Sequence, residues 1–323
     1  MSAVITADSW LQTLAAEYLE TFIPAGGAAV KFAVAPSEDD VTTLAAQIAD
    51  QARNAGFVVA TVRAADVRLH MLDKFFGAVA QQVPWRELAT ARLAAMATSS
   101  FSVPARLSPA AVARQLAAAN DVDEAYVRMI IGQRIAQDVF RDRELARDFR
   151  IAMTWLCRAV LEGGPEGETQ IDDIVAWLSG EVRQISAMKP YTIYTKVNRT
   201  NARHHFESLF TWVRRADCAG TAVIVDGARF TRRERAVDGS VNYTRNALLD
   251  AYEVFRQFID STDDMHSAVL VAVMAPEFDT TEFGSGVRGL GAYTALLNRI
   301  YDEVRDRRHV NPMSSLVRIG GGA

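Results

Sequence analysis

Cysteine is almost absent from this sequence, with Cys157 and Cys218 the only two among 323 residues. Each lies in an apolar context, so we expect both to fill core positions and not to form a bridge. No apolar run reaches the roughly 18 residues that a membrane-spanning helix needs. The N-terminus also lacks a basic segment followed by a continuous apolar core, so it is not a secretory signal. These absences predict a cytoplasmic protein with no membrane partner.

Strong net charge is also missing. The formal net charge is -4 and half of the residues are hydrophobic, which suits one large globular domain or two smaller ones. The mild acidity gives no general attraction to nucleic acid, although a local basic patch stays possible. Common catalytic signatures are absent: there is no G-x-S-x-G, C-x-x-C or H-E-x-x-H. His204 and His205 are adjacent, whereas a helical metal pair would stand at i and i+4, so no metal site is predicted.

Apolar runs alternate with helical patterns along most of the chain. Four runs predict strands buried on both faces: residues 28–34, 57–62, 221–226 and 268–274. Helical periodicity is expected over residues 8–24, 37–54, 67–162, 171–178, 201–215, 243–260 and 293–307, and the run 163–168 is expected to be a linker. The alternation predicts an α/β fold with a mainly parallel sheet and a large helical insertion. We divide the chain into a first core part (1–66), the helical insertion (67–215) and a second core part (216–323).

The turn after the first predicted strand stands where a phosphate-binding loop would be. That loop reads G-x-x-x-x-G-K-[ST]. Laid on residues 35–42, the pattern puts Ala35 and Asp40 at its glycines, Val41 at its lysine and Thr42 at its hydroxyl. Only the hydroxyl is retained, and Thr43 offers a second one. The remaining candidates for nucleotide-binding residues in this turn are therefore Thr42 and Thr43, and the lysine that would bind phosphate is missing.

An ordinary helix start explains the same turn. Ser37 and Asp40 resemble a capping box, and the acids Glu38, Asp39 and Asp40 favour the positive end of a helix dipole. On local sequence alone, an ordinary capped helix is preferred to a degenerate nucleotide site.

The third predicted strand ends in Asp226, followed by Gly227. An Asp at such a strand end positions magnesium in P-loop enzymes. Many of these enzymes place a glutamate next to it, and here that position is glycine. Asp226 is the third candidate for a degenerate nucleotide site.

A basic cluster follows this strand, and more cations precede it. The cluster consists of Arg229, Arg232, Arg233 and Arg235, and the upstream cations are Lys196, Arg199, Arg203, Arg214 and Arg215. Such groups could bind nucleic-acid phosphates. A solvated surface paired with acids is the competing interpretation.

Taken in order, several segments resemble the ATP-binding proteins of bacterial phage-exclusion (BREX and Pgl-type) defence systems, which are P-loop proteins with an AAA-like core. The segments are Trp10, Ala25–Phe32, Phe57–Ala60 with Leu69-His70, Trp177-Leu178-Ser179-Gly180-Glu181 (similar to the family's W-L-x-G-E), Cys218–Asp226, Pro276-Glu277-Phe278, Arg288-Gly289, Tyr293, Leu296, Arg299 and Val317-Arg318.

The resemblance implies an AAA-like P-loop core, with Walker A at residues 35–42 and Walker B at Asp226. Both motifs depart from the family, which normally keeps G-K-[ST] and an Asp-Glu pair. Loss at two separated motifs reverses the local preference for a simple capped helix. We expect a pseudo-ATPase with no bound cofactor, acting as a structural or regulatory subunit. The expected partners are other defence proteins (a large ATPase, helicase or methyltransferase), a second copy of the chain, and DNA.

Two alternatives stay open at this point. One is an active ATPase with a non-standard loop that uses Lys31, Thr42, Thr43 and Asp226. The other is a nucleic-acid-binding module that uses the basic surface from Arg203 to Arg235.

Overall fold

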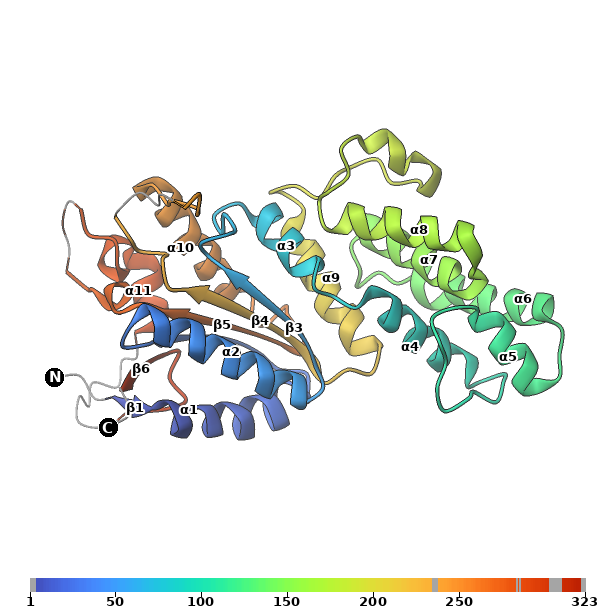
Figure 1. The fold of residues 1–323 in the computed structure, drawn as a ribbon, viewed down its shortest axis with the longest axis horizontal. Coiled ribbons are helices and arrows are strands. Elements are labelled where there is room, and N and C mark those ends of the chain that lie inside the picture. Colours follow the sequence, from blue (N-terminus) through green and yellow to red (C-terminus); the bar gives the residue numbers. More distant parts are fainter. Residues whose placement is uncertain (1–3, 234–237, 283, 285, 302–309, 321–323) are drawn as a thin grey trace. The chain divides into compact units, whose positions relative to one another are not determined.

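The computed structural model describes residues 4–233, 238–282, 284, 286–301 and 310–320. It divides into two compact units: Met1–Val79 with Cys218–Ala323, and Ala80–Asp217. The first unit contains the sheet and the second is helical (Figure 1).

The first unit is built on one parallel sheet of six strands, in the order β1-β6-β2-β5-β4-β3. The strands are β1 (Ile5–Thr6), β2 (Ala28–Val34), β3 (Phe57–Arg63), β4 (Gly220–Gly227), β5 (Ala268–Met274) and β6 (Leu316–Gly320). All five pairings are parallel. The α/β class with a parallel sheet is therefore confirmed, and the arrangement is consistent with a P-loop-like core.

Helices cover both faces of this sheet. On one face lie α1 (Ala7–Thr13), the π-helix η1 (Leu14–Phe22) and α2 (Glu38–Asn54), whose apolar side chains join one cluster with Ala33, Ile224 and Val271. On the other face lies α10 (Arg245–Asp260), where Phe255 meets Phe32 edge-on at a ring separation of 5.6 Å. Burial on both faces explains why the strands read as unbroken apolar runs.

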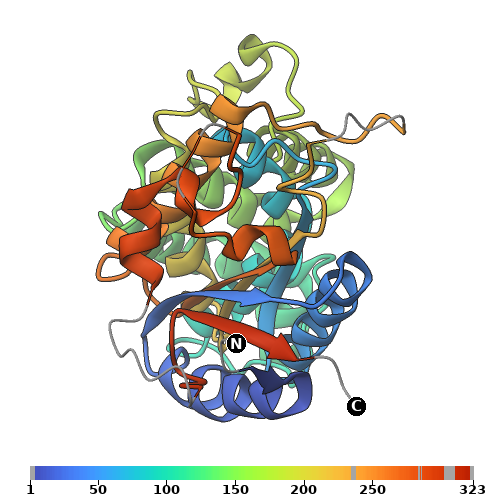
Figure 2. The ribbon, with the colours of Figure 1, turned by 90° about the vertical axis from the view of Figure 1, so that its left-hand side faces the viewer.

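The sheet edge around β6 was not predicted. Figure 2 shows β6 beside β2, with α1 below it. Strands β1 and β6 have two and five residues, too short to stand out by periodicity. The remaining elements of this unit are the 3-10 helices η4 (Pro276–Asp279) and η5 (Leu290–Ala292) and helix α11 (Thr294–Ile300). The predicted helix over residues 293–307 is too long at position 301, because α11 ends at Ile300 and Tyr301 is extended, and residues 302–307 lie outside the described residues.

The second unit is a bundle of helices after α3 (Leu72–Ala80). It comprises α4 (Trp85–Ala97), α5 (Val112–Asn120), α6 (Glu124–Ile135), the π-helix η2 (Ala136–Phe140), α7 (Arg147–Glu162), α8 (Gly164–Leu178), the 3-10 helix η3 (Ile185–Tyr191) and α9 (Ala202–Arg215). Among the described residues, no helix is both long and apolar enough to cross a membrane.

The linker expected at residues 163–168 is wrong. Only Gly163, at a φ of 66°, separates α7 from α8, and Gly164–Leu178 is helical. Pro165 fits the first turn of a helix, where no intrahelical donor is needed. Gly167 packs so closely on α7 that a Cβ there would lie 2.7 Å from the Ala159 carbonyl oxygen. Gly167 therefore allows α8 to pack closely on α7, and the segment does not separate two domains.

His205 belongs to the core of the helical unit. Its side chain on α9 is buried against the rings of Phe149 and Trp177, at centroid separations of 6.0 and 5.4 Å. Burial lowers the pKa of His205 to about 4 from its ordinary 6.5, and the carboxylate of Asp148 partly opposes this shift. The ring is therefore neutral at physiological pH.

We predict that His205 makes the helical unit sensitive to acid. Its pKa is lower in the folded chain than in the unfolded chain, so the unfolded chain binds the proton more tightly. The free energy of unfolding should fall by up to about 3 kcal/mol as the pH drops from 6.5 to 4. Urea denaturation across this window checks it. His205→Phe should flatten the dependence, whereas the matched change His204→Phe, at an exposed position, should preserve it. An unchanged slope in His205→Phe would contradict the assignment.

Candidate functional site

The candidate site lies where three parallel strands end side by side. Val34 of β2 is paired with Met274 of β5, which is paired with Gly227 of β4. Ligands of open α/β sheets bind beyond the carboxyl ends of the strands. The turn from Ala35 to Ser37 and the residues after β4 both begin at this edge.

Thr42 and Asp226 meet here, although 184 positions separate them in sequence. The Thr42 hydroxyl on α2 donates to Asp226 Oδ2 at 2.9 Å. Asp226 Oδ1 accepts from the Ala228 backbone N–H at 3.0 Å, and the Asp226 side chain is 5% exposed. Two hydrogen bonds thus hold the buried carboxylate. Thr43 does not join the pair, because its hydroxyl donates to the Asp39 carbonyl one turn earlier in the same helix.

The turn that would hold phosphate is mostly helix. Only Ala35 and Pro36 separate β2 from Ser37, which caps α2. Ser37 Oγ accepts from the Asp40 backbone N–H at 3.2 Å and donates to Asp40 Oδ2 at 2.6 Å, and the Val41 N–H donates to the Ser37 carbonyl. Residues 38–42, which occupy the last five of the eight positions of the phosphate-loop motif, are therefore helical. Two backbone donors that a phosphate-binding loop would aim at its ligand, the N–H groups of Asp40 and Val41, are used within the helix start.

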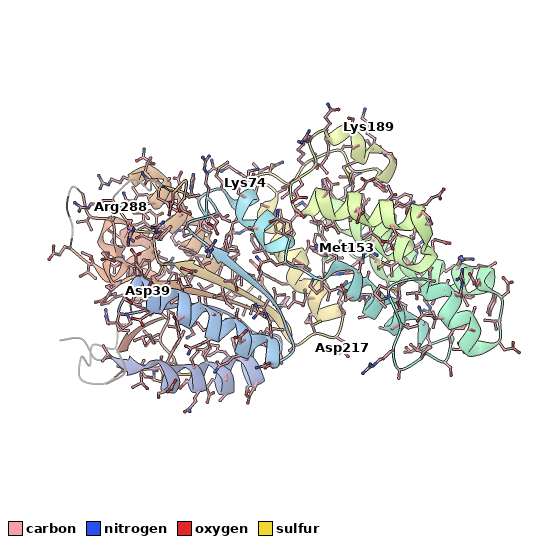
Figure 3. All side chains as sticks on the ribbon, viewed as in Figure 1. Asp39, Lys74, Met153, Lys189, Asp217 and Arg288 are labelled. Atoms are coloured by element: carbon pink, nitrogen blue, oxygen red, sulfur yellow. The ribbon has the colours of Figure 1, made fainter. Side chains whose placement is uncertain are left out.

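The side chains of this first turn are either acidic or buried. Glu38 Oε1 forms an ion pair with Arg232 Nε at 2.6 Å. Val41, at the position of the motif lysine, is fully buried in the apolar cluster between α2 and the sheet. The carboxylates of Glu38, Asp39 and Asp40 all belong to the helix end that faces the strand edge (Figure 3 labels Asp39).

Gly227 occupies the position where a catalytic glutamate would follow the strand-end aspartate. A Cβ atom there would lie 2.3 Å from Met274 Sδ and 2.9 Å from the Val273 carbonyl oxygen. The methionine side chain can move, but the backbone oxygen of the neighbouring strand moves only with β5. The position is therefore closed to a side chain as the sheet stands.

Lys31 lies away from this edge. It is the fourth residue of β2, about 13 Å along the strand from Ala35. Its ammonium donates to the carbonyl oxygens of Met313 and Ser314 and lies 4.3 Å from the centre of the Tyr18 ring. Burial lowers the pKa of Lys31 to about 8. This lysine anchors the segment before β6 and is not beside Thr42 or Asp226.

The predicted basic cluster is largely engaged with neighbouring groups. Arg229 pairs with Asp238 at 2.5 Å, Arg232 pairs with Glu38, and the Arg233 guanidinium donates to the Gly286 carbonyl oxygen. Arg235 lies outside the described residues. The upstream cations Arg203, Arg214 and Arg215 belong to the helical unit, and Arg215 pairs there with Asp142 and Glu144. Binding of nucleic acid by Arg229, Arg232, Arg233 and Arg235 stays a prediction.

Two features of the site were missed in the sequence. The Glu38–Arg232 pair joins residues 194 positions apart, and opposite charges alone do not identify partners at that distance. Met274 closes the Gly227 position from the end of the neighbouring strand. The register of β4 with β5 would have revealed it, but strand order was not available from the sequence.

We predict that Gly227→Ala is destabilising. The added methyl must displace Met274 and strain against β5, which should cost about 1–3 kcal/mol, as overpacking of a core does. Thermal denaturation measures the effect. Gly132→Ala is the matched control, because a Cβ at this helical position meets nothing within 4 Å and should give about 0.5–1 kcal/mol of stabilisation. A neutral Gly227→Ala would show that the position is open.

Comparison with known proteins identifies the family. Residues 17–321 match the model of the BREX system ATP-binding protein BrxC/D family. No curated protein and no solved structure matches the chain significantly. The matched range includes both strand ends of the candidate site and the helical unit. The chain therefore belongs to the BREX system ATP-binding protein BrxC/D family, a component of a phage-defence system that works with other proteins of that system.

Proposed function

We propose that this chain is a catalytically degenerate P-loop subunit that serves the defence system as a structural or regulatory component. The observation that carries the proposal is the helical turn Glu38–Val41, which stands where the family's phosphate loop would be.

The charge at this turn opposes a triphosphate. A phosphate brought beside Glu38, Asp39 or Asp40 would meet like charge, at roughly 4 kcal/mol per close pair in partly screened surroundings. It would also lack the contact with a lysine, about 1.5–3 kcal/mol for a charged hydrogen bond. The Ser37 cap already satisfies the Asp40 N–H. The residues present do not fit a Mg-ATP site.

The same contacts favour a scaffold that keeps its shape without a nucleotide. Thr42 and Asp226 join α2 to β4 directly, and Glu38 and Arg232 join the start of α2 to the loop after β4. In a P-loop enzyme, magnesium and phosphates would bridge these elements. A strand edge that is held together by the chain's own contacts suits a subunit whose role is to bind protein partners. We propose as partners a large ATPase, helicase or methyltransferase of the same system, or a second copy of this chain.

One observation favours the alternative of an active ATPase with a non-standard loop. The pairing of the Thr42 hydroxyl with the Asp226 carboxylate retains two groups that would hold magnesium. The position of Lys31 weighs against this alternative, because its ammonium is bound to the carbonyls of Met313 and Ser314.

We expect Mg-ATP to bind more weakly than about 100 μM, which corresponds to roughly 5.5 kcal/mol. Isothermal titration calorimetry of the purified chain measures this, and a phosphate-release assay tests turnover. Tighter binding that Asp226→Ala abolishes would overturn the proposal and support the active ATPase. Tight binding that Asp226→Ala leaves unchanged would also refute it and would move the site elsewhere.

The partner role is tested separately. Affinity purification of the full chain from its native host, with and without phage, should recover a large ATPase, helicase or methyltransferase of the defence system. Glu38→Arg with Arg232→Glu restores the pair with reversed charge and should keep the shape and the recovered partner. Recovery of the chain alone under both conditions would contradict a subunit role.

A further inference from the structure

A basic segment of the helical unit stands out from the charge pattern of the rest of the chain. From Arg183 to Arg203 the sequence carries five cations and no acid, within a chain of net charge -4. The part from Arg183 to Lys196, here called the basic arm, includes η3 and the extended segment that follows it. Tyr191, at the end of η3, is hydrogen-bonded to Trp155 of α7 and Asp173 of α8, and Figures 1 and 2 draw η3 as a short helix beside the bundle, with Lys189 labelled on it in Figure 3.

The cations of the basic arm have no carboxylate partner, although carboxylates were available to many arginines elsewhere. Twelve described arginines form such an ion pair: Arg53, Arg63, Arg86, Arg114, Arg128, Arg147, Arg215, Arg229, Arg232, Arg256, Arg299 and Arg318. Other exposed arginines, such as Arg68 and Arg106, have no carboxylate partner among the described residues either, so the arm is distinguished by its run of cations without an acid. Arg183, Lys189 and Lys196 are exposed, and none forms an ion pair with a described residue. Within the part of the chain that the structure describes, the Lys196 ammonium donates to the Arg183 carbonyl oxygen alone, and no carboxylate compensates its charge.

Three acids close to the basic arm each accept a hydrogen bond from an uncharged side chain. Asp173 accepts from the Tyr191 hydroxyl at 2.7 Å, and Asp148 accepts from the Thr195 hydroxyl. Glu181, just before the arm, accepts from Gln81 at 3.0 Å. These bonds fix the arm while leaving its positive charges facing solvent.

The basic arm is also firmly anchored. The indole N–H of Trp155 donates to the Tyr191 carbonyl at 3.1 Å, and that of Trp177 donates to the Thr195 carbonyl at 2.9 Å. Met188 and Ile193 are fully buried beneath it. Between these anchors Tyr194 is 57% exposed, the most exposed of the large aromatic side chains on the described surface. A solvated charge run needs no such anchoring, and an exposed aromatic ring costs hydration.

We infer that the basic arm is a binding site for single-stranded nucleic acid. Arg183, Lys189 and Lys196 would contact backbone phosphates, and the Tyr194 ring would stack on an unpaired base. Cations that follow a backbone, combined with an aromatic platform, are the general solution for strands whose bases are free to stack. Duplex DNA keeps its bases stacked inside and offers only its phosphates. The inference does not rest on the nucleotide site and concerns other residues than the Arg229–Arg235 cluster.

The test measures binding of a fluorescently labelled oligothymidylate to the full chain by anisotropy, over a series of salt concentrations. The triple variant Arg183→Ala, Lys189→Ala, Lys196→Ala should weaken binding at low salt. It should also reduce the slope of log K against log salt by about 2, since each phosphate contact on a single strand contributes about 0.7. Tyr194→Ala should weaken binding at least about fivefold without changing the slope, and Tyr194→Phe should retain it.

A matched triple variant separates a site from diffuse attraction. Arg53→Ala, Arg63→Ala and Arg114→Ala remove the same charge from exposed arginines that have carboxylate partners, and should leave the slope unchanged. Equal losses in both triple variants would overturn the inference, as would no binding by the unaltered chain at low salt. An equally tight duplex together with a silent Tyr194→Ala would overturn it in favour of phosphate attraction alone.

Discussion

The hydrogen bond between Thr42 and Asp226 is the contact on which the arrangement of the strand edge depends. Asp226 is buried at the end of β4, where an unpaired carboxylate would cost several kcal/mol. Thr42 and the Ala228 N–H satisfy its two oxygens, and Thr42 is held in place by α2. The position of α2 along the sheet and the turn after β4 are thus coupled through one carboxylate. The ion pair from Glu38 to Arg232 spans the same two elements farther out.

This coupling explains how two distant departures from a nucleotide site belong together. If the first turn of α2 fills the phosphate position, the residues beyond β4 have no ligand to reach. A glycine can then follow Asp226, and Met274 can fill the space that a side chain at position 227 would need. Restoring a lysine at position 41 would not reverse this, because Val41 is fully buried in the core of the sheet. The departures are part of the packing and not isolated losses.

The sequence predicts the local elements well because their causes are local. Strands β2 and β5 begin and end where their apolar runs do, and Ser37 caps α2 as its side chain suggests. Strands β2 and β3 are joined through α2 in a βαβ unit, but they are not neighbours in the sheet. Strands β5 and β4, which come more than 150 residues later, insert between them. No pattern within residues 28–63 records that insertion.

The candidate site was predicted in part for the same reason. The spacing of the motifs predicted Thr42 and Asp226 as site residues, and in the fold their side chains are hydrogen-bonded to each other. Thr43 was an equally good candidate by residue type, but its hydroxyl turns back to the helix, as threonines within helices often do. The arginines after β4 looked like a free basic patch because their partners, Glu38 and Asp238, are assigned only by the tertiary structure. A count of charged residues along a sequence overestimates the number of unpaired charges wherever folding supplies counter-ions. The basic arm is informative because folding supplies no counter-ion to Arg183, Lys189 or Lys196 among the described residues.

A helix N-terminus that is capped by its own residues has a thermodynamic consequence. A phosphate-binding loop leaves backbone donors for its ligand, so ligand binding adds RT ln(1 + [L]/Kd) to the stability of the folded state. In this chain Ser37 accepts from the N–H groups of Asp40 and Val41, and the acids of the first turn lie at the positive end of the helix dipole. If the chain is the degenerate subunit proposed above, the stability of the first unit is independent of nucleotide concentration. Such a subunit would present the same surface to its partners at high and at low nucleotide concentration, and a response to nucleotide would then come from a partner.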